Sequence, residues 1–443
     1  MARSRPAVIV ALGVMRRLAV GSSASRVFAA QVVTTGLNVL ATVVVARTMG
    51  LEGTGTLTVL IAASWILSVC FEFGLSSAAP YGMGRLGLKA EEIQTVYVAA
   101  TVLVGLIAVL LCASPLASWS ARLLRLGSEF TFQAAIFTGA ALASTNMCKQ
   151  LLMTCGRETV VAWLWPLDRA VLAVAVAIPV LGVGTQRDLP AAVLASGLVA
   201  FVAHWFAVLG LVGGRLVVPW PAIRAISRNS ASVYASSVMQ VLNYRLDALL
   251  VSAFAGASAV GIYGVAVSLA NLLWYVPNAV SFVWLPKVSR LAPVDASRRT
   301  AEITRLTFRM VAVSALALAL ISRPLIRILW GESFVRASWA ILALLPGVIL
   351  FSVPKVLASD FIGRGRSRVM TEAAGLSLTL TVALDLLLIP AFGYMGAAVA
   401  SSISYGVFAI YCVVRYRRMT GLSPLGLLFA NEEHGTAVES EHV

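Results

Sequence analysis

Long apolar runs separated by short polar segments dominate the chain. A membrane-spanning helix needs about 20 predominantly apolar residues, and the 443-residue sequence holds twelve runs of this kind. They cover approximately residues 27–48, 57–80, 95–118, 132–155, 160–183, 189–213, 229–255, 259–286, 305–329, 337–361, 369–390 and 395–415. The pattern predicts an all-α polytopic membrane protein with twelve transmembrane helices, joined by loops too short to fold as separate domains.

Composition agrees with this pattern and excludes other classes of protein. Hydrophobic residues make up 59% of the chain and charged residues 12%, whereas soluble proteins carry about 25% charge. The mean hydropathy is +0.90, so a soluble domain, a secreted disulfide scaffold and a disordered protein are excluded. The five cysteines lie in apolar runs without metal-binding spacing, and we expect them to pack in the core rather than bind a metal.

Basic residues in the loops predict the orientation of the chain. One side carries 22 Lys and Arg residues, including those at both ends of the chain, the other side carries seven, and five lie in the spans. Because basic loops stay in the cytoplasm, we expect both termini to be cytoplasmic. Most of the net charge of +15 then reflects topology, and we expect no nucleic-acid partner.

The spans and loops divide the chain into five parts. The first is a short amphipathic segment without a signal-peptide cleavage site, and the last is a polar tail that we expect to be disordered. The predicted parts are an N-terminal segment (1–26), an N-lobe with helices one to six (27–213), a linker (214–228), a C-lobe with helices seven to twelve (229–418) and a cytoplasmic tail (419–443).

The two lobes are an internal repeat. Ala191–Val193 recurs as Ala397–Val399, 206 residues later. Gly55 precedes Pro80 by 25 residues, and Gly261 precedes Pro286 by the same number. Since six helices return the chain to its starting side, the repeats are parallel and related by an axis normal to the membrane.

Polar residues form stripes on four helices that the repeat relates. Positions three or four apart share one helix face. The stripes are Gln31, Thr35, Asn38 and Thr42 in helix one, Ser64, Ser68 and Glu72 in helix two, Ser236, Gln240, Asn243 and Asp247 in helix seven, and Asn271, Tyr275 and Asn278 in helix eight. Such stripes either line a hydrated cavity or join helices by hydrogen bonds. Their recurrence on repeat-related helices favours a shared cavity.

Ionisable residues inside the spans are candidates for function or for structural pairing. Arg245 and Asp247 are two residues apart and point to opposite sides of a helix, so we expect one to serve the cavity and the other to pair with a neighbouring helix. Asp168 and Arg169 are more typical of structural pairing, and His204 of packing. Three other charges are open to a cavity role or a buried ion pair: Lys149, Lys355 and Asp385.

Several short motifs together resemble the polysaccharide-transporter branch of the multidrug/oligosaccharidyl-lipid/polysaccharide exporter superfamily. The motifs are Val45–Gly50 with Gly53–Gly55, Asn243–Asp247 with Gly261–Tyr263 and Pro286, and Gly363–Arg366 with Leu388–Pro390, Gly393 and Gly396–Ala398. The resemblance implies two six-helix lobes in a V shape around a cavity lined by helices one, two, seven and eight. It also implies flipping of undecaprenyl-diphosphate-linked oligosaccharides, with a polysaccharide polymerase and glycosyltransferases as candidate partners. The related lipid II flippases have two further C-terminal helices and a more basic cavity.

From this resemblance we expect a flippase of the inner membrane that works by alternating access, without catalytic residues, cofactor or metal. Arg245, Arg47 and Arg169 are the candidates for binding diphosphate or acidic sugar, because guanidinium binds phosphate bidentately. Glu72 and Asp247 are candidates for ion or proton coupling. The full expected cavity set is Gln31, Thr35, Asn38, Arg47, Ser68, Glu72, Arg169, Gln240, Asn243, Arg245, Asp247, Asn271, Tyr275 and Asn278.

Two alternatives remain open at this point. A cation-coupled multidrug exporter of the same superfamily would share the fold. A polytopic glycosyltransferase or ligase is less favoured, because it needs catalytic acids in an outer loop, and glutamates such as Glu129 and Glu332 are scarce there.

Overall fold

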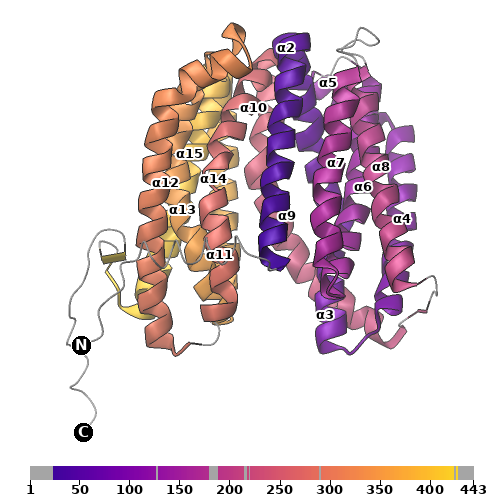
Figure 1. Ribbon diagram of the computed structural model, residues 1–443. Helices are drawn as coiled ribbons and strands as arrows, with labels where there is room; N and C mark the ends of the chain where they lie inside the picture. The colour runs from indigo at the N-terminus through magenta and orange to yellow at the C-terminus, as the bar shows by residue number, and fades with distance from the viewer. Residues whose placement is uncertain are drawn as a thin grey trace.

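The computed structural model describes residues 23–125, 128–178, 188–213, 217–218, 220–288, 291–423 and 426–427, which form helices and contain no strand (Figure 1). Most of the expected N-terminal segment, part of the expected linker and most of the expected tail lie outside these residues. The all-helical membrane fold is confirmed.

The helices follow the apolar runs closely. The N-terminal half contains α2 (Ser23–Glu72), η1 (Leu75–Ser77), α3 (Ala78–Arg85), α4 (Ala90–Ala113), α5 (Pro115–Leu123), α6 (Glu129–Thr154), α7 (Glu158–Ala177) and α8 (Leu189–Val212). The C-terminal half contains α9 (Trp220–Ala255), α10 (Ala257–Leu272), α11 (Tyr275–Val288), α12 (Pro293–Leu329), η4 (Glu332–Phe334), α13 (Ala337–Gly363), α14 (Arg368–Phe392) and α15 (Tyr394–Thr420).

Helix α2 contains the first predicted span and most of the second, joined at Gly50, and the predicted second span (57–80) is broken after Glu72. Gly50 has φ 65° and ψ −153°, a backbone conformation that only glycine adopts readily. The chain therefore turns without a loop, and the second segment returns to the lower end of Figure 1, where α3 follows. The sequence predicts the two spans but not this direct junction.

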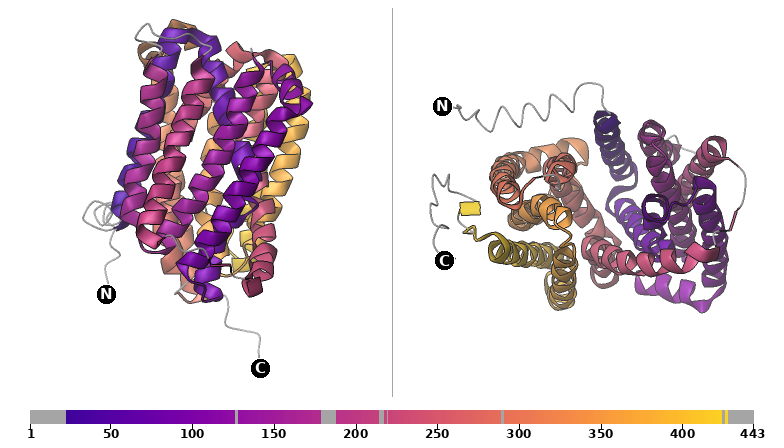
Figure 2. Two further views of the ribbon diagram at one scale, coloured as in Figure 1. Left: turned by 90° about the vertical axis from the view of Figure 1, so that its right-hand side faces the viewer. Right: turned by 90° about the horizontal axis from the view of Figure 1, so that it is seen from below.

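The helices gather into two lobes, seen from the side in Figure 1 and from below in Figure 2. In the N-lobe, α2 packs against α6 and α7, and α6 packs against α4 and α8. In the C-lobe, α13 packs against α12 and α15, and α14 packs against α9 and α15. Contacts of α2 with α9 and α10 join the lobes.

The crossing of α2 and α10 obeys the internal repeat. A Cβ atom on Gly55 would overlap the carbonyl of Ala257, and one on Gly261 would overlap the carbonyl of Leu51. Leu51 and Ala257 are 206 residues apart, as are Gly55 and Gly261. The contact of Gly55 with Ala257 is therefore the repeat counterpart of the contact of Gly261 with Leu51. The pseudo-two-fold axis relating the lobes passes through this glycine crossing.

Apolar side chains cover the outer faces of the bundle. Leu106 and Leu110 on α4, and Leu316 and Leu320 on α12, are all more than half exposed, which in a soluble protein would be a large unfavourable surface. Among the described residues, eight helices can cross a membrane by length and hydropathy, or nine if the bent α10–α11 pair is one span. The protein is a multi-pass membrane protein, and the number twelve stays a prediction.

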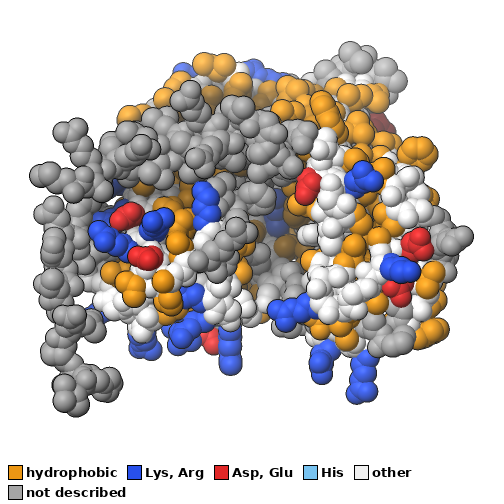
Figure 3. Space-filling model, turned by 60° about the horizontal axis from the view of Figure 1, so that its bottom comes forward, with side chains coloured by type: hydrophobic (Ala, Val, Ile, Leu, Met, Phe, Trp, Pro, Cys, Tyr) orange, Lys and Arg blue, Asp and Glu red, His pale blue; other side chains and the backbone are white. Residues whose placement is uncertain are grey.

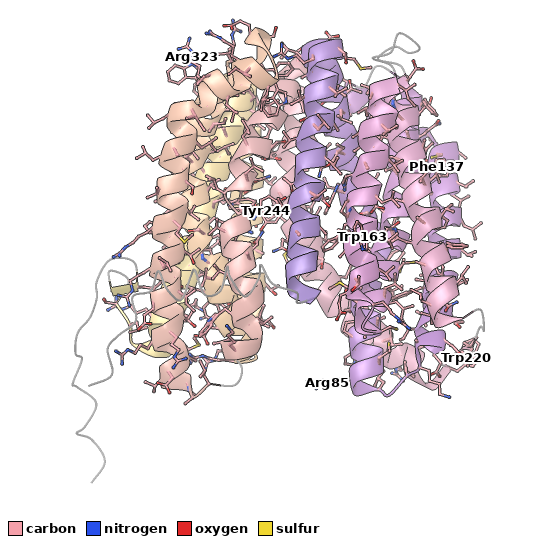
Figure 4. The ribbon with its side chains drawn as sticks, in the orientation of Figure 1. Arg85, Phe137, Trp163, Trp220, Tyr244 and Arg323 are labelled. Atoms are coloured by element: carbon pink, nitrogen blue, oxygen red, sulfur yellow. The ribbon has the colours of Figure 1, made fainter. Side chains whose placement is uncertain are left out.

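The two ends of the bundle carry different groups of basic residues. Arg85 lies at the lower end and Arg323 at the upper end in Figure 4, opposite sides as the loop analysis predicts. Figure 3 shows Lys and Arg side chains projecting from the lower ends of both lobes, with a hollow between the lobes. We take the lower end as the predicted cytoplasmic side.

Candidate functional site

A cavity of about 220 Å³ lies between the two lobes. Its walls come from both segments of α2, from α7 and from α9, α10 and α11. Half of the fourteen expected site residues line it: Thr35, Asn38, Arg169, Arg245, Asp247, Asn271 and Tyr275.

Two arginines bring positive charge into this cavity from opposite lobes. Arg169 comes from α7 and Arg245 from α9, and both are partly buried. The guanidinium carbon of Arg245 lies 5.6 Å from the centre of the Trp65 ring, a cation–π distance. Within the part of the chain that the structure describes, neither arginine has a carboxylate oxygen within 4.0 Å. The cavity thus holds two cationic groups that no carboxylate of the described residues neutralises.

The carboxylate of Asp247 is hydrogen-bonded to α10, to α15 and to its own helix α9. It accepts hydrogen bonds from the Tyr263 hydroxyl, from the Ser401 hydroxyl at 3.4 Å and from the backbone N–H of Ala248 at 2.7 Å. Arg245, two residues away, lies next to Trp65, and both Arg245 and Asp247 line the cavity, although the sequence predicts that only one of them does so. Deeper in the C-lobe, Asp385 is fully buried, and neither of its carboxylate oxygens has a hydrogen-bond partner among the described residues.

Hydroxyl and amide groups complete the cavity wall. The hydroxyl groups of Thr35 on α2 and Tyr275 on α11 are hydrogen-bonded to each other and join the two lobes. Asn38 and Asn271 line the same space. Such groups can donate to and accept from the hydroxyls of a sugar.

Three expected residues are exposed and lie outside the cavity wall. Gln31, Gln240 and Asn278 are exposed, and each comes from the same stripe as a lining residue. Asn278 accepts a hydrogen bond from Lys355 Nζ at 3.2 Å.

Four other expected residues make structural contacts away from the cavity. Ser68 bonds to the Trp65 carbonyl at 3.0 Å, and Glu72 accepts from Asn146 Nδ2 at 2.7 Å. The structure places Asn243 against α14, where it is 3% exposed and bonds to Ser377 and Thr381. Arg47 donates to backbone carbonyls at the end of α12.

The buried charges of the N-lobe form a separate group. Lys149 Nζ lies 3.1 Å from Asp168 Oδ2, and His204 Nδ1 lies 3.7 Å from the other carboxylate oxygen. Lys149 is therefore half of a buried ion pair, and its partner is Asp168 rather than a cavity ligand. Arg169, the neighbour of Asp168, lines the cavity.

Sequence reasoning missed several lining residues, most of them aromatic or small. The cavity wall includes Trp65, Tyr244 and Tyr263, as well as Thr58 and Ser268. Ser268 extends the Asn271 stripe by one helical step, and that spacing was a usable signal. No signal separated the aromatic residues from ordinary core residues.

The described residues hold no group of three or more His, Cys, Asp or Glu side chains that could bind a metal ion. Two cysteines, Cys148 and Cys412, are buried, and the other three are partly buried.

Comparison with known proteins identifies the family. The family model described as "Polysaccharide biosynthesis protein" matches residues 20–292. The chain belongs to this family. A second model, "Lipid II flippase MurJ", matches residues 170–436. The resemblance to polysaccharide flippases of the exporter superfamily is thus confirmed, and it extends over both lobes.

Two curated relatives match part of the chain. An "Uncharacterized membrane protein MJ1068" from Methanocaldococcus jannaschii is 27% identical over 183 residues, 40% of this chain. A "Probable low-salt glycan biosynthesis flippase Agl15" from Haloferax volcanii is 25% identical over 166 residues, 37% of this chain. The alignments span only 36% and 35% of these relatives.

Solved structures share the fold at low sequence identity. A lipid II flippase MurJ in an inward closed conformation has a TM-score of 0.73 at 14% identity, over 88% of this chain and 87% of that one. An inward-facing multidrug-resistance MATE transporter has a TM-score of 0.68 at 16% identity, over 88% of this chain and 96% of that one. The V-shaped two-lobe architecture is therefore shared with both flippases and drug exporters of the superfamily.

Proposed function

We propose that this family member flips an undecaprenyl-diphosphate-linked oligosaccharide across the inner membrane by alternating access, with both termini in the cytoplasm. The observation that carries the proposal is the pair of arginines, Arg169 and Arg245, that enter one interlobe cavity without a carboxylate partner among the described residues. An arginine at mid-membrane depth costs about 2.5–3.5 kcal/mol on insertion scales. A substrate diphosphate between the two guanidinium groups would offset that cost by bidentate hydrogen bonds.

The rest of the wall suits the glycan and the coupling step. Asn38, Asn271 and the Thr35–Tyr275 pair supply donors and acceptors for sugar hydroxyls. Asp247 is the acid that we assign to ion or proton coupling, because it lines the cavity. The other expected coupling acid, Glu72, bonds to Asn146 outside the cavity wall.

A cation-coupled multidrug exporter is the alternative, and MATE structures share the fold. Two guanidinium groups in the cavity disfavour a cationic drug there, because like charges repel strongly where water is scarce. The arginine pair therefore favours the flippase over the exporter.

The test uses full-length protein in liposomes with a fluorescent undecaprenyl-diphosphate oligosaccharide, and an impermeant quencher that reports its arrival in the other leaflet. We expect Arg245→Ala to abolish flipping at wild-type protein levels. Arg245→Lys should retain part of it, since Lys keeps the charge but loses the fork. Arg323→Ala, at the exposed upper end, is the matched control. Wild-type flipping by Arg245→Ala would overturn the assignment of this arginine to substrate, and cation transport without lipid flipping would establish the exporter.

A further inference from the structure

Lys355 on α13 is an intramembrane cation that the proposed diphosphate site does not use. Its ammonium nitrogen lies 4.6 Å from the centre of the Trp274 ring, 5.3 Å from that of Phe351 and 5.9 Å from that of Tyr244. It donates a hydrogen bond to Asn278 Oδ1 at 3.2 Å. Among the described residues no carboxylate oxygen lies within 4.0 Å of this nitrogen.

These neighbours orient the ammonium but do not neutralise it. Aromatic faces stabilise a cation by about 0.5–2 kcal/mol each, and an amide oxygen carries only a partial charge. An ammonium group has three donors, of which Asn278 accepts one. The side chain of Lys355 is partly exposed rather than sealed in the core, so a ligand can approach the remaining donors.

Polar groups around Lys355 match a carbohydrate. Asn278 and Gln240 are both exposed, and Gln240 precedes Tyr244 by four residues on α9, so the two side chains share one face of this helix. Tyr244 also belongs to the wall of the cavity between the lobes, and Figure 4 shows it on the side of the C-lobe that faces α2. Two amides, an ammonium and an aromatic wall thus lie side by side, directly next to the cavity.

We propose that Lys355, Gln240 and Asn278 form a second subsite on the C-lobe that binds the carboxylate of an acidic sugar. The ammonium pairs with the carboxylate, and the two amides bind neighbouring hydroxyls. A single cation against aromatic rings suits a monovalent carboxylate, whereas a diphosphate is better matched by the forked guanidinium pair. This inference rests on the proposed function, because the carboxylate and the diphosphate belong to one substrate, a lipid diphosphate that carries a uronic-acid-type glycan.

Binding of small anions to the full-length protein in detergent separates the two sites. The probes are glucuronate, neutral glucose and inorganic diphosphate at matched ionic strength, with the thermal unfolding midpoint as readout. We expect glucuronate to stabilise the wild type and glucose to have no effect. Lys355→Gln should weaken glucuronate binding about tenfold or more, the effect of losing one hydrogen bond to a charged group. Lys355→Arg should retain it.

Two controls make the result specific. Lys287→Gln removes an exposed lysine at the end of α11 and should leave glucuronate binding unchanged. Inorganic diphosphate should stabilise Lys355→Gln as well as the wild type, whereas Arg245→Ala should lose diphosphate and keep glucuronate. Size-exclusion profiles establish that each variant is folded.

The outcomes distinguish this subsite from the proposed function. Undiminished glucuronate binding in folded Lys355→Gln overturns the subsite, as does equal loss of diphosphate, which would place Lys355 in the phosphate site. Loss of glucuronate binding in Lys355→Gln supports the subsite even if the liposome assay shows no lipid flipping. In that case the flippase assignment fails and the acidic-sugar site stands.

Discussion

Arg47 holds the upper ends of the two lobes together, and its removal should open them. It extends from the first segment of α2 and donates through Nε to the Leu329 carbonyl at 2.9 Å, with further bonds from Nη2 to the carbonyls of Arg327 and Ile328. These carbonyls end α12, where the helix dipole also favours a cation. The sequence suggested a substrate role for Arg47, but the structure places it outside the cavity wall.

The size of the effect follows from these contacts. Hydrogen bonds to charged groups contribute about 1.5–3 kcal/mol when buried. Arg47 is exposed, so we take about 1–2 kcal/mol for the whole set after solvent screening. Arg47→Ala should therefore raise the ratio of outward-open to outward-closed protein about 5- to 30-fold.

Double electron–electron resonance between spin labels at Trp119 on α5 and Trp339 on α13, both exposed, measures that ratio in a cysteine-free background. Arg122→Ala is the control, because within the described part of the chain the hydrogen bond of Arg122 goes to the Ser118 carbonyl of its own helix. An unchanged distance distribution would show that Arg47 does not hold the lobes together. If lipid flipping were lost at the same time, Arg47 would instead be assigned to substrate binding.

Three further predictions test the site, the core and the topology. A hydrophilic thiol reagent should label Asn38→Cys in the cavity but not Asn243→Cys, which lies buried against α14; labelling of both would show that α9 turns its polar stripe to water. Lys149→Met should destabilise the solubilised protein by about 3–5 kcal/mol, because it leaves Asp168 unpaired. The double change Lys149→Met with Asp168→Leu should restore much of the melting temperature. An equally unstable double variant would show that packing matters more than the ion pair. Reporter fusions after Arg298, near the start of α12, and after Arg336, beyond its end, should report opposite sides of the membrane, and identical reports would contradict the predicted spans.

Much of the fold could be predicted because burial in a membrane leaves a simple signal. Apolar runs of spanning length marked the helices, and the 206-residue offset predicted the equivalence of the lobes that Gly55 and Gly261 display at their crossing. The junction at Gly50 was missed, since a glycine in an apolar run does not reveal whether the helix continues or reverses there.

The site was only half predictable, for a geometric reason. A polar stripe gives the angles between residues on one helix but not the rotation of that helix against its neighbours. In α9 this rotation turns Asn243 toward Ser377 and Thr381, and brings Tyr244 and Arg245 to the cavity. The stripe on α9 therefore includes the interhelical hydrogen bonds that had been the alternative interpretation.

The glycine crossing of α2 and α10 bears on how the lobes can move. There Gly55 and Gly261 lie against the backbone of the opposite helix with no side chain between them, so large side chains do not interlock at this point. Interdigitated ridges of large side chains would obstruct a rotation of the two helices, whereas helices in backbone contact can rotate against each other without such obstruction. The crossing thus has the properties of a fulcrum on the symmetry axis, and equal and opposite tilts of the lobes about it would leave the joint itself unchanged.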